Sequence, residues 1–399
     1  MGALLVVLFA LAAVAFTRHR MLRPYAFTVW VFAFVAASMA YPWAFGTWFG
    51  FDLRHLITPL VQIIMFGMGT TLSVRDFTRV LAMPWPVIVG VALQYTIMPF
   101  VGFGLAKLFG FEAEVAAGVV LIGSAPSGVA SNVINYLARA NVPLSVTLTA
   151  LATLMSPIMT PLMMKLLAGQ YITVSFVKMM VDICNMILVP VIAGLVAHRV
   201  LYGTLPQFRK AGPLAALGGL GLLLAVLVGL TPVAWLGALK SGLILGFSML
   251  AVTILAKLVV ELWLKGPSTW MDRALPVVSM AGICFIIAII TARSSEDLKR
   301  VGLALLGAAM LHNLLGYLLG YYAARALRLS VVDARTVAVE VGMQNGGMAS
   351  GLAMNTLQSA KAALAPAIFG PWMNVSGSIL ASYWRKRPPP GPSGETPNP

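Results

Sequence analysis

Long apolar segments, separated by short polar loops, follow one another along the whole chain. Most have 17 or more residues, about the length that an α-helix needs to cross a lipid bilayer. Ten-residue stretches that alternate between apolar and polar positions, typical of outer-membrane barrels, are absent. The pattern therefore predicts an all-α polytopic membrane protein. The predicted helical segments are 2–17, 25–42, 56–73, 85–109, 113–136, 144–168, 175–201, 213–231, 235–264, 274–292, 301–326, 334–356 and 362–384.

Two of these segments are interrupted by glycine, proline and polar residues. One contains "GSAPSGVASN" (123–132), and the other contains "VAVEVGMQNGGMASGLAMN" (337–355), with Gly346 and Gly347 at its centre. Non-helical backbone at membrane depth is tolerated only against protein or a water-filled cavity. Two discontinuous helices at corresponding positions of two halves are typical of a transporter binding site. We therefore expect the two breaks, the second at the Gly-Gly pair, to form such a site.

The second interrupted segment carries an acidic residue, Glu340, and the nearest cation in the sequence is Arg335. Burying an acid in a membrane helix costs about 2.5–3.5 kcal/mol even on the lenient insertion scale. An intramembrane acid therefore indicates a functional site, although a neutral structural acid is the alternative.

Other polar side chains accompany both breaks. Ser131 and Asn132 follow the first break, Gln344 and Asn345 precede the second, and Ser145 and Thr149 share one face of the next helix. Hydroxyl, amide and carboxylate oxygens suit a small hard cation, and neither break contains His or Cys. The alternatives are hydroxyls bonded to their own helix and amides that join neighbouring helices.

Composition excludes a soluble globule, because 60% of the residues are hydrophobic and 10% are charged, against about 25% in soluble domains. The net charge of +15 does not indicate nucleic-acid binding, because the basic residues lie in short loops between apolar segments. The two cysteines, Cys184 and Cys284, lie within apolar stretches and predict neither a disulfide framework nor a metal site.

The loop charges orient the chain in the membrane. Most of the 27 Lys and Arg residues fall in one of the two alternating sets of loops, the set that includes the C-terminal segment. Because basic residues are more frequent on the cytoplasmic side, this predicts a cytoplasmic C-terminus. The charges "RHR" follow the first apolar segment rather than precede it, which favours an extra helix over a cleaved signal peptide. Residues 385–399 are basic and then proline-rich, which predicts a disordered cytoplasmic tail.

Five motifs, in this order, resemble the bile acid:sodium symporter family, particularly its bacterial members. The resemblance covers the chain from about Tyr25 to Trp384. The motifs are "IMFGMGTTLSVRDFTRVL", "GSAPSGVASNVINYLARANVPLSVTLTALATLMSPIMTP", "LHNLLGY", "VEVGMQNGGMASGLA" and "GPWMNVSGSILASYW".

The resemblance implies a ten-helix transporter unit of panel and core domains, built as two inverted repeats with two crossed broken helices. Residues 203–268 replace a short loop of the family and are long enough for an inserted two-helix hairpin. The expected divisions are an extra N-terminal helix and basic loop (1–24), a first repeat (25–202, broken at 123–132), the hairpin (203–268), the remainder of the second repeat (269–384, broken at 340–350) and the tail (385–399).

The same resemblance implies two sodium sites that share Glu340. Site 1 would consist of Ser131, Asn132, Ser145, Thr149 and Glu340, and site 2 of Gln94, Glu340, Val341, Met343 and Gln344. Substrate would contact Ser127, Val129, Asn345 and Asn374. Val129 stands where relatives carry a threonine that faces substrate, so the resemblance does not fix the substrate.

Together these features predict a sodium-coupled symporter that imports an organic anion, either a small carboxylate or a steroid-like molecule, by alternating access. The expected location is a bacterial inner membrane. No cofactor besides the coupling sodium ions and no nucleic-acid partner is expected. A proton-coupled carrier, in which Glu340 titrates, is the alternative. A membrane-embedded enzyme is disfavoured because the segments contain no constellation of catalytic residues.

Overall fold

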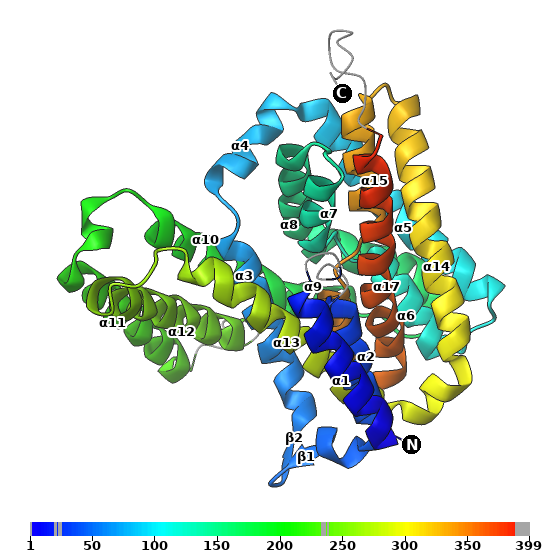
Figure 1. Cartoon of the computed structure of the whole chain (residues 1–399), viewed down its shortest axis with the longest axis horizontal. Helices are drawn as coiled ribbons and strands as arrows, with labels where there is room; N and C mark the ends of the chain where they lie inside the picture. The colour runs from blue at the N-terminus through cyan, green and yellow to red at the C-terminus, as the bar shows by residue number, and fades with distance from the viewer. Residues whose placement is uncertain (1, 20–21, 23–25, 233–236, 238, 388–399) are drawn as a thin grey trace.

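The computed structural model describes residues 2–19, 22, 26–232, 237 and 239–387. These residues form an almost entirely helical fold (Figure 1) with one short hairpin of β1 (Thr47–Trp48) and β2 (Phe51–Asp52). The all-α prediction is confirmed. The helices are α1 (Gly2–Arg18), α2 (Ala26–Ala40), α3 (Ile57–Thr70), α4 (Val74–Ala82), α5 (Pro84–Leu108), α6 (Ala113–Ser124), α7 (Ala130–Leu137), α8 (Val142–Leu167), α9 (Phe176–Ile183), α10 (Val189–Tyr202), α11 (Ala211–Leu230), α12 (Lys240–Lys257), α13 (Trp270–Arg293), α14 (Ser295–Ala326), α15 (Val331–Gly342), α16 (Gly346–Asn355) and α17 (Ala360–Arg385).

Among the described residues, seven helices are long and apolar enough to cross a membrane. They are α5, α8, the continuous pair α9–α10, α11, α12 with its π-helical extension (Leu258–Trp263), α13 and α14. An eighth is added if the bent pair of α3 and α4 counts as one span. The chain is therefore a multi-pass membrane protein. The ten-helix layout and the division into repeats stay predictions, and most of the predicted tail (388–399) lies outside the described residues.

The helices form two groups (Figure 1). In the first, here called the outer group, α3 packs on α10 and α13, and α13 packs on α2, which in turn contacts α1. In the second, here called the crossing group, α5 packs on α6, α8 and α14, and α17 packs on α6, α14 and α16. Helix α16 touches α3, so the outer group meets the crossing group beside the second interrupted segment.

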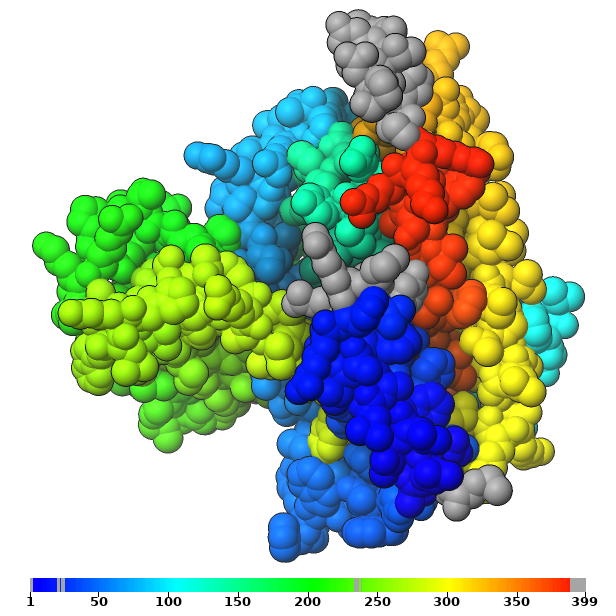
Figure 2. All heavy atoms as spheres, viewed as in Figure 1, coloured from blue at the N-terminus to red at the C-terminus, as the bar shows by residue number. Residues whose placement is uncertain are grey.

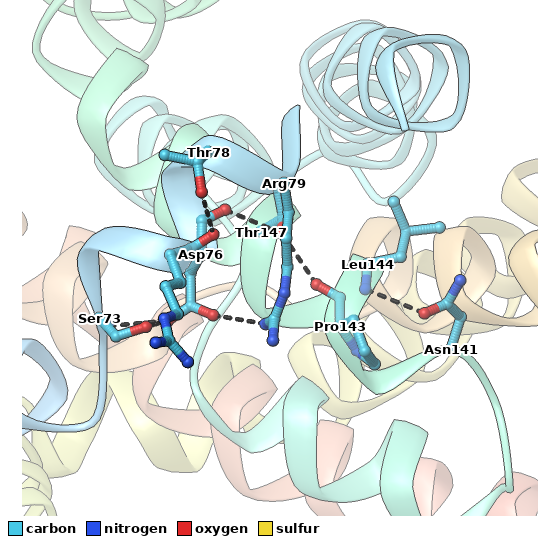
Figure 3. Close-up of polar contacts among 9 residues, drawn as sticks. Ser73, Asp76, Thr78, Arg79, Asn141, Pro143, Leu144 and Thr147 are labelled. Atoms are coloured by element: carbon cyan, nitrogen blue, oxygen red, sulfur yellow. Dashed lines mark hydrogen bonds and ion pairs between the residues drawn. The ribbon is translucent and has the colours of Figure 1, made fainter. Parts of the chain in front are cut away.

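Helix α4 was not predicted, and it joins the outer group to α8 (Figure 3). Its start is fixed by a capping box in which the Ser73 backbone N–H donates to Asp76 Oδ2 over 2.7 Å. Asp76 Oδ1 also accepts from Arg79, at 2.6 Å. The hydroxyl of Thr147 on α8 donates to the Asp76 backbone carbonyl over 3.1 Å. These bonds attach α8, the helix that carries Ser145 and Thr149, to α4, the helix that follows α3.

The pair α11–α12 projects from one side of the molecule (Figures 1 and 2) and is attached to the outer group through α12. Asn185, in the π-helical turn between α9 and α10, accepts from the Gly242 backbone N–H at 2.6 Å and donates to Ser241 Oγ at 2.8 Å. At the other end of α12, Lys257 donates to the Leu201 carbonyl at 2.6 Å. The hairpin thus braces α10 and lies away from the two breaks.

A close approach of α6 to α17 generates the first prediction. A Cβ atom on Gly118 would lie 2.1 Å from the Ala362 carbonyl oxygen, whereas one on Gly104 of α5 would meet nothing within 4 Å. We expect Gly118→Ala to lower the free energy of unfolding by about 1–3 kcal/mol through overpacking. Thermal unfolding in detergent measures this effect. Gly104→Ala is the matched control, and equal midpoints for the two variants would contradict the packing described.

Candidate functional site

The two breaks bond to each other through their backbones, and this contact is here called the crossing. Residues 125–129 separate α6 from α7, and residues 343–345 separate α15 from α16. Ser127 and Gln344 form an antiparallel bridge. The Gly128 N–H donates to the Met343 carbonyl over 3.2 Å, and the Asn345 N–H donates to the Pro126 carbonyl over 2.8 Å. Each break therefore supplies partners for backbone groups that the other leaves outside a helix.

Proline explains the first break, and a side-chain cap explains the second. Ala125 precedes Pro126 and has an extended backbone (ψ 149°), as a residue before proline prefers. Asn345 precedes α16, and its Oδ1 accepts from the Met348 N–H at 3.0 Å. The prediction that the Gly-Gly pair is the break is wrong, because Gly346 and Gly347 are the first residues of α16.

Glycine at position 346 serves a close contact between helices. A Cβ atom there would lie 3.3 Å from both the Gly370 Cα and the Pro366 carbonyl oxygen on α17. Glycine is therefore used for close approach of the backbones, and the break itself is made by the three residues before it.

The Glu340 carboxylate lies on α15, 2% exposed, inside a cluster of hydroxyl and amide groups. Its Oε1 accepts from Ser131 Oγ at 2.7 Å, from Ser145 Oγ at 2.6 Å and from Asn135 Nδ2 at 3.2 Å. Its Oε2 accepts from Thr149 Oγ1 at 2.8 Å. The carboxylate thus joins side chains from α7 and α8 to α15.

The structure brings the other predicted member of site 1 into the same cluster. Asn132 Oδ1 lies 2.7 Å from Ser145 Oγ and 3.3 Å from Thr149 Oγ1, and the single hydrogen of each hydroxyl goes either to this oxygen or to the Glu340 carboxylate. The sequence interpretation missed Asn135, which lies one helical turn after Ser131. The same four-residue spacing that singled out Ser145 and Thr149 could have found it.

No basic side chain forms an ion pair with Glu340 in the described part of the chain. Arg335, the nearest cation in the sequence, instead donates to the Arg387 carbonyl over 2.8 Å and lies 5.4 Å from the Trp384 ring. A buried carboxylate without a cationic partner is costly, and a bound cation would offset that cost.

The residues predicted for site 2 surround the crossing without closing into one hydrogen-bonded cluster. Gln94 on α5 donates to the Ala125 carbonyl at 3.1 Å, and Gln344 donates to the Val341 carbonyl. The Met343 carbonyl is already used by the crossing. Within the described residues, the buried Oε1 atoms of Gln94 and Gln344 have no hydrogen-bond partner, so both acceptors are available to a ligand.

A cavity of about 640 Å³ lies between the crossing and the outer group. Its wall is mostly apolar and comes from α3, α7, α13, α17 and residues 343–347. Val129, Asn345 and Asn374, which were predicted to contact substrate, all line it. Ser127 is not among the lining residues, and its hydroxyl lies 3.5 Å from that of Thr149, in the Glu340 cluster. The crossing therefore has an ionisable cluster on one side and an apolar cavity on the other.

Two polar side chains of the cavity wall are already partly bonded. Asn374 Nδ2 donates to the Gly370 carbonyl of its own helix at 2.9 Å. Asn345 Nδ2 lies 3.7 Å from Met65 Sδ, a weak acceptor, while its Oδ1 caps α16. Of the two amide oxygens, Asn374 Oδ1 is therefore the more available to accept from a ligand. Of the two amide nitrogens, that of Asn345 is the more weakly bonded and thus the more available to donate.

Comparisons with known proteins identify the family of the chain. The model of the Sodium Bile acid symporter family matches residues 58–236. An uncharacterized sodium-dependent transporter, YocS of Bacillus subtilis (strain 168), is 36% identical over 361 residues, which cover 90% of this chain and 91% of that protein. A probable sodium/metabolite cotransporter, chloroplastic BASS1 of Oryza sativa subsp. japonica, is 28% identical over 91% of this chain and 73% of that protein.

More local or weaker likenesses complete the comparison. The ileal sodium/bile acid cotransporter of Homo sapiens is 35% identical over 97 residues, 24% of this chain and 28% of that protein. The sodium proton antiporter MjNhaP1 from Methanocaldococcus jannaschii aligns with a TM-score of 0.49 at 12% identity, over 97% of this chain and 99% of that chain, a likeness too weak to bear on function. The extent and identity of the Bacillus match show that the chain belongs to the sodium bile acid symporter family, a family of membrane transporters and not of enzymes.

Proposed function

We propose that the protein is a sodium-coupled symporter that imports an organic anion by alternating access. The observation that carries the proposal is the buried Glu340 carboxylate, which accepts from three hydroxyls and one amide and has no ion-pair partner among the described residues. A cation is the natural complement of such a group. Family membership, with relatives named as sodium-dependent transporters and sodium/metabolite cotransporters, favours sodium as that cation.

Sodium site 1 is proposed at the centre of the Glu340 cluster. Its ligands would be oxygens of Glu340 and of the side chains that already bond to it or to one another, namely Ser131, Asn132, Ser145 and Thr149. These are hard ligands, as sodium requires. Each hydroxyl can rotate its hydrogen away and present a lone pair, so the site can accept an ion with little movement of the backbone.

Sodium site 2 is proposed between Glu340 and the crossing, with Gln94, Val341, Met343 and Gln344. The unpartnered Oε1 atoms of Gln94 and Gln344 support it. A buried acceptor left without a partner costs about 1–3 kcal/mol, and ligation of a cation would recover that cost. Because Glu340 would belong to both sites, loading of one would influence the other.

The organic anion is proposed to bind in the cavity on the other side of the crossing. A volume of about 640 Å³ is sufficient for either a small carboxylate or a steroid-like molecule. Val129, Asn345 and Asn374 line the wall, and a contact with Ser127 has less support because its hydroxyl points to Thr149. Helices α7 and α16 both begin at this wall, and their N-terminal ends favour negative charge.

Coupling follows from the shared crossing. Sodium bound around Glu340 would connect α7, α8 and α15 and fix residues 343–345, which also form part of the cavity wall. The anion would then find a completed wall only when sodium is bound. The outer and crossing groups would move relative to each other to expose the cavity to either side. We place the protein in a bacterial inner membrane with a cytoplasmic C-terminus, supported by the distribution of Lys and Arg over the loops.

Reconstituted transport tests the proposal. Small carboxylates, keto acids and one bile acid are first screened for their effect on the unfolding midpoint in NaCl and in KCl, since a ligand of the folded state stabilises it. Uptake of the selected compound is then measured in proteoliposomes. Uptake driven by an inward sodium gradient is expected. Uptake that ignores sodium, or that a pH gradient alone drives, would contradict sodium coupling and favour the proton-coupled alternative.

The carboxylate generates the second prediction. Glu340→Gln retains the shape of the side chain but removes its charge, so we expect loss of both sodium-driven uptake and sodium-induced stabilisation. For the wild type, sodium at a hundred times its dissociation constant would stabilise by about 2.7 kcal/mol. Glu261→Gln, on the α12 extension, removes an acid that pairs with Lys257 at 3.3 Å and serves as the control. Full sodium-dependent transport by Glu340→Gln is the result that excludes this site.

Site 2 generates the third prediction. Gln94→Leu should weaken sodium binding about tenfold, the effect of losing one ligand to a charged group, and should flatten the sodium titration curve. Gln62→Leu is the matched control, because Gln62 is also buried and donates to a backbone carbonyl, that of Asn185, at 3.1 Å. Sodium titrations of the purified protein measure both the dissociation constant and the steepness of the curve. Identical behaviour of the two variants would remove Gln94 from the site.

The cavity generates the fourth prediction. Asn374→Leu should raise the KM for the selected anion about tenfold, because a buried polar contact with a charged ligand contributes that much. Its sodium affinity, measured without substrate, should stay unchanged, since among the described residues the Asn374 side chain bonds only within α17. Asn355→Leu, an exposed position at the end of α16, controls for a general effect of losing an amide. An unchanged KM for Asn374→Leu would argue against this placement of the anion.

A further inference from the structure

Asp272 carries the only ionisable side chain among the described residues that line the cavity. It is exposed and lies in the first turn of α13. Every other side chain of the described lining is apolar, a hydroxyl or an amide, and none belongs to Lys, Arg or His. The described wall of a cavity proposed for an organic anion therefore contains a carboxylate and no basic group.

The crossing end of the cavity is formed by the two breaks and the residues beside them. Asn345 Nδ2 lies 3.7 Å from Met65 Sδ on α3, and the Gly128 N–H donates to the Met343 carbonyl. Helices α7 and α16 begin here, so their N-terminal ends and the weakly bonded amide nitrogen of Asn345 attract negative charge. The proposed function therefore places the carboxylate of the anion at this end.

The far end of the cavity lies further along the same segments. The lining continues from Met65 to Thr71 on α3, from Gly128 to Leu137 through α7, and from Gly370 to Ser378 on α17. At a helical rise of about 1.5 Å per residue, each of these stretches is roughly 9–14 Å long. The cavity is therefore long enough for the two ends of one ligand to meet different surroundings.

Helix α13 brings Asp272 to the far end. This helix runs antiparallel to α3, because a Cβ atom on Gly67 would lie 3.0 Å from Leu275 and one on Gly282 would lie 3.3 Å from Ile64. Asp272 precedes Leu275 on α13, so it lies beside the last turn of α3 and away from the crossing.

The Asp272 carboxylate has a hydrogen-bond donor but no counter-charge in the described part of the chain. Tyr202 of α10 donates to its Oδ1, and no basic side chain described here pairs with it. The far-end hydroxyls of Thr71 and Ser378 donate to carbonyls of their own helices, at 2.7 and 2.8 Å. The far end is thus negative, whereas the crossing end favours an anion.

We infer that Asp272 makes the cavity selective for organic anions with a single negative charge, by repelling a second carboxylate at the far end. This inference rests on the proposed function. An anion whose carboxylate binds at the crossing extends its other end toward Asp272. A hydroxyl there can donate to Asp272. A second carboxylate would instead lie near a like charge, in a cavity whose apolar walls strengthen the repulsion.

The fifth prediction compares octanedioate with its monomethyl ester, two probes of similar length that differ by one charge. Their dissociation constants are obtained from the unfolding midpoint of the full-length protein in detergent, with saturating NaCl. For the wild type, we expect the dianion to bind about tenfold more weakly than the ester, because its second carboxylate loses water and approaches Asp272.

Removal of the Asp272 charge should reduce this difference. Asp272→Asn retains an oxygen that can accept from Tyr202. It should tighten binding of the dianion about fivefold, the effect of a like charge about 8 Å away at an effective dielectric constant of about 40. The dissociation constant of the ester should change by less than about twofold, because the ester has no charge at the far end.

Controls separate this role from a structural one. Asp297→Asn is the matched control, because Asp297 pairs with Lys361 at 3.3 Å and does not line the cavity, and it should leave both constants as in the wild type. If Asp272→Asn does not fold, Asp272→Ser replaces it, since a serine hydroxyl can also accept from Tyr202.

Several outcomes would overturn the inference: equal affinity of the wild type for the two probes, an unchanged difference in Asp272→Asn, an equal gain in affinity for both probes, or the same change in Asp297→Asn. A wild type that sodium stabilises but the ester does not would also overturn it. A wild type that sodium does not stabilise would instead overturn the proposed function.

Discussion

A buried carboxylate with no basic partner among the residues that the structure describes is the constraint on which the rest of the fold depends. Placing Glu340 at membrane depth is costly, and hydrogen bonds from Ser131, Ser145, Asn135 and Thr149 offset only part of that cost. These four donors come from two helices, α7 and α8, so the acid also determines how those helices sit against α15. The remaining imbalance of charge is what makes a cation the expected occupant.

The crossing of two interrupted helices makes this arrangement possible. The breaks at residues 125–129 and 343–345 give each other backbone partners, so neither needs water at that depth. The crossing also separates the Glu340 cluster from the cavity, while residues 343–345 belong to both. The link from α4 to α8 through Thr147 and the attachment of α12 to Asn185 then fix the surroundings of the crossing to the rest of the chain.

The sequence predicted most of the helices, although not α4, and both interruptions, because apolar length and interrupting glycine, proline and polar residues are local signals. It also singled out Glu340 as an intramembrane acid, and the role of that residue stays a prediction. It placed the second break two or three residues late, because a Gly-Gly pair in a sequence indicates a break in a helix. The sequence does not reveal that Asn345 caps α16 or that Gly346 packs closely against α17. It missed Asn135, although the four-residue spacing from Ser131 places both side chains on one face of a helix. The packing of the hairpin on α10 was likewise beyond prediction, because it depends on contacts between residues far apart in the sequence.

The central claim is that sodium at Glu340 stabilises the crossing itself. Backbone hydrogen exchange measures this directly, through peptides that contain the N–H groups of Gly128 and Asn345, which donate across the crossing. The account predicts slower exchange of these peptides in NaCl than in KCl at equal ionic strength, and no such difference in peptides from α11, which lies away from the crossing. Equal exchange of the crossing peptides in the two salts, under conditions in which sodium binds, would contradict it.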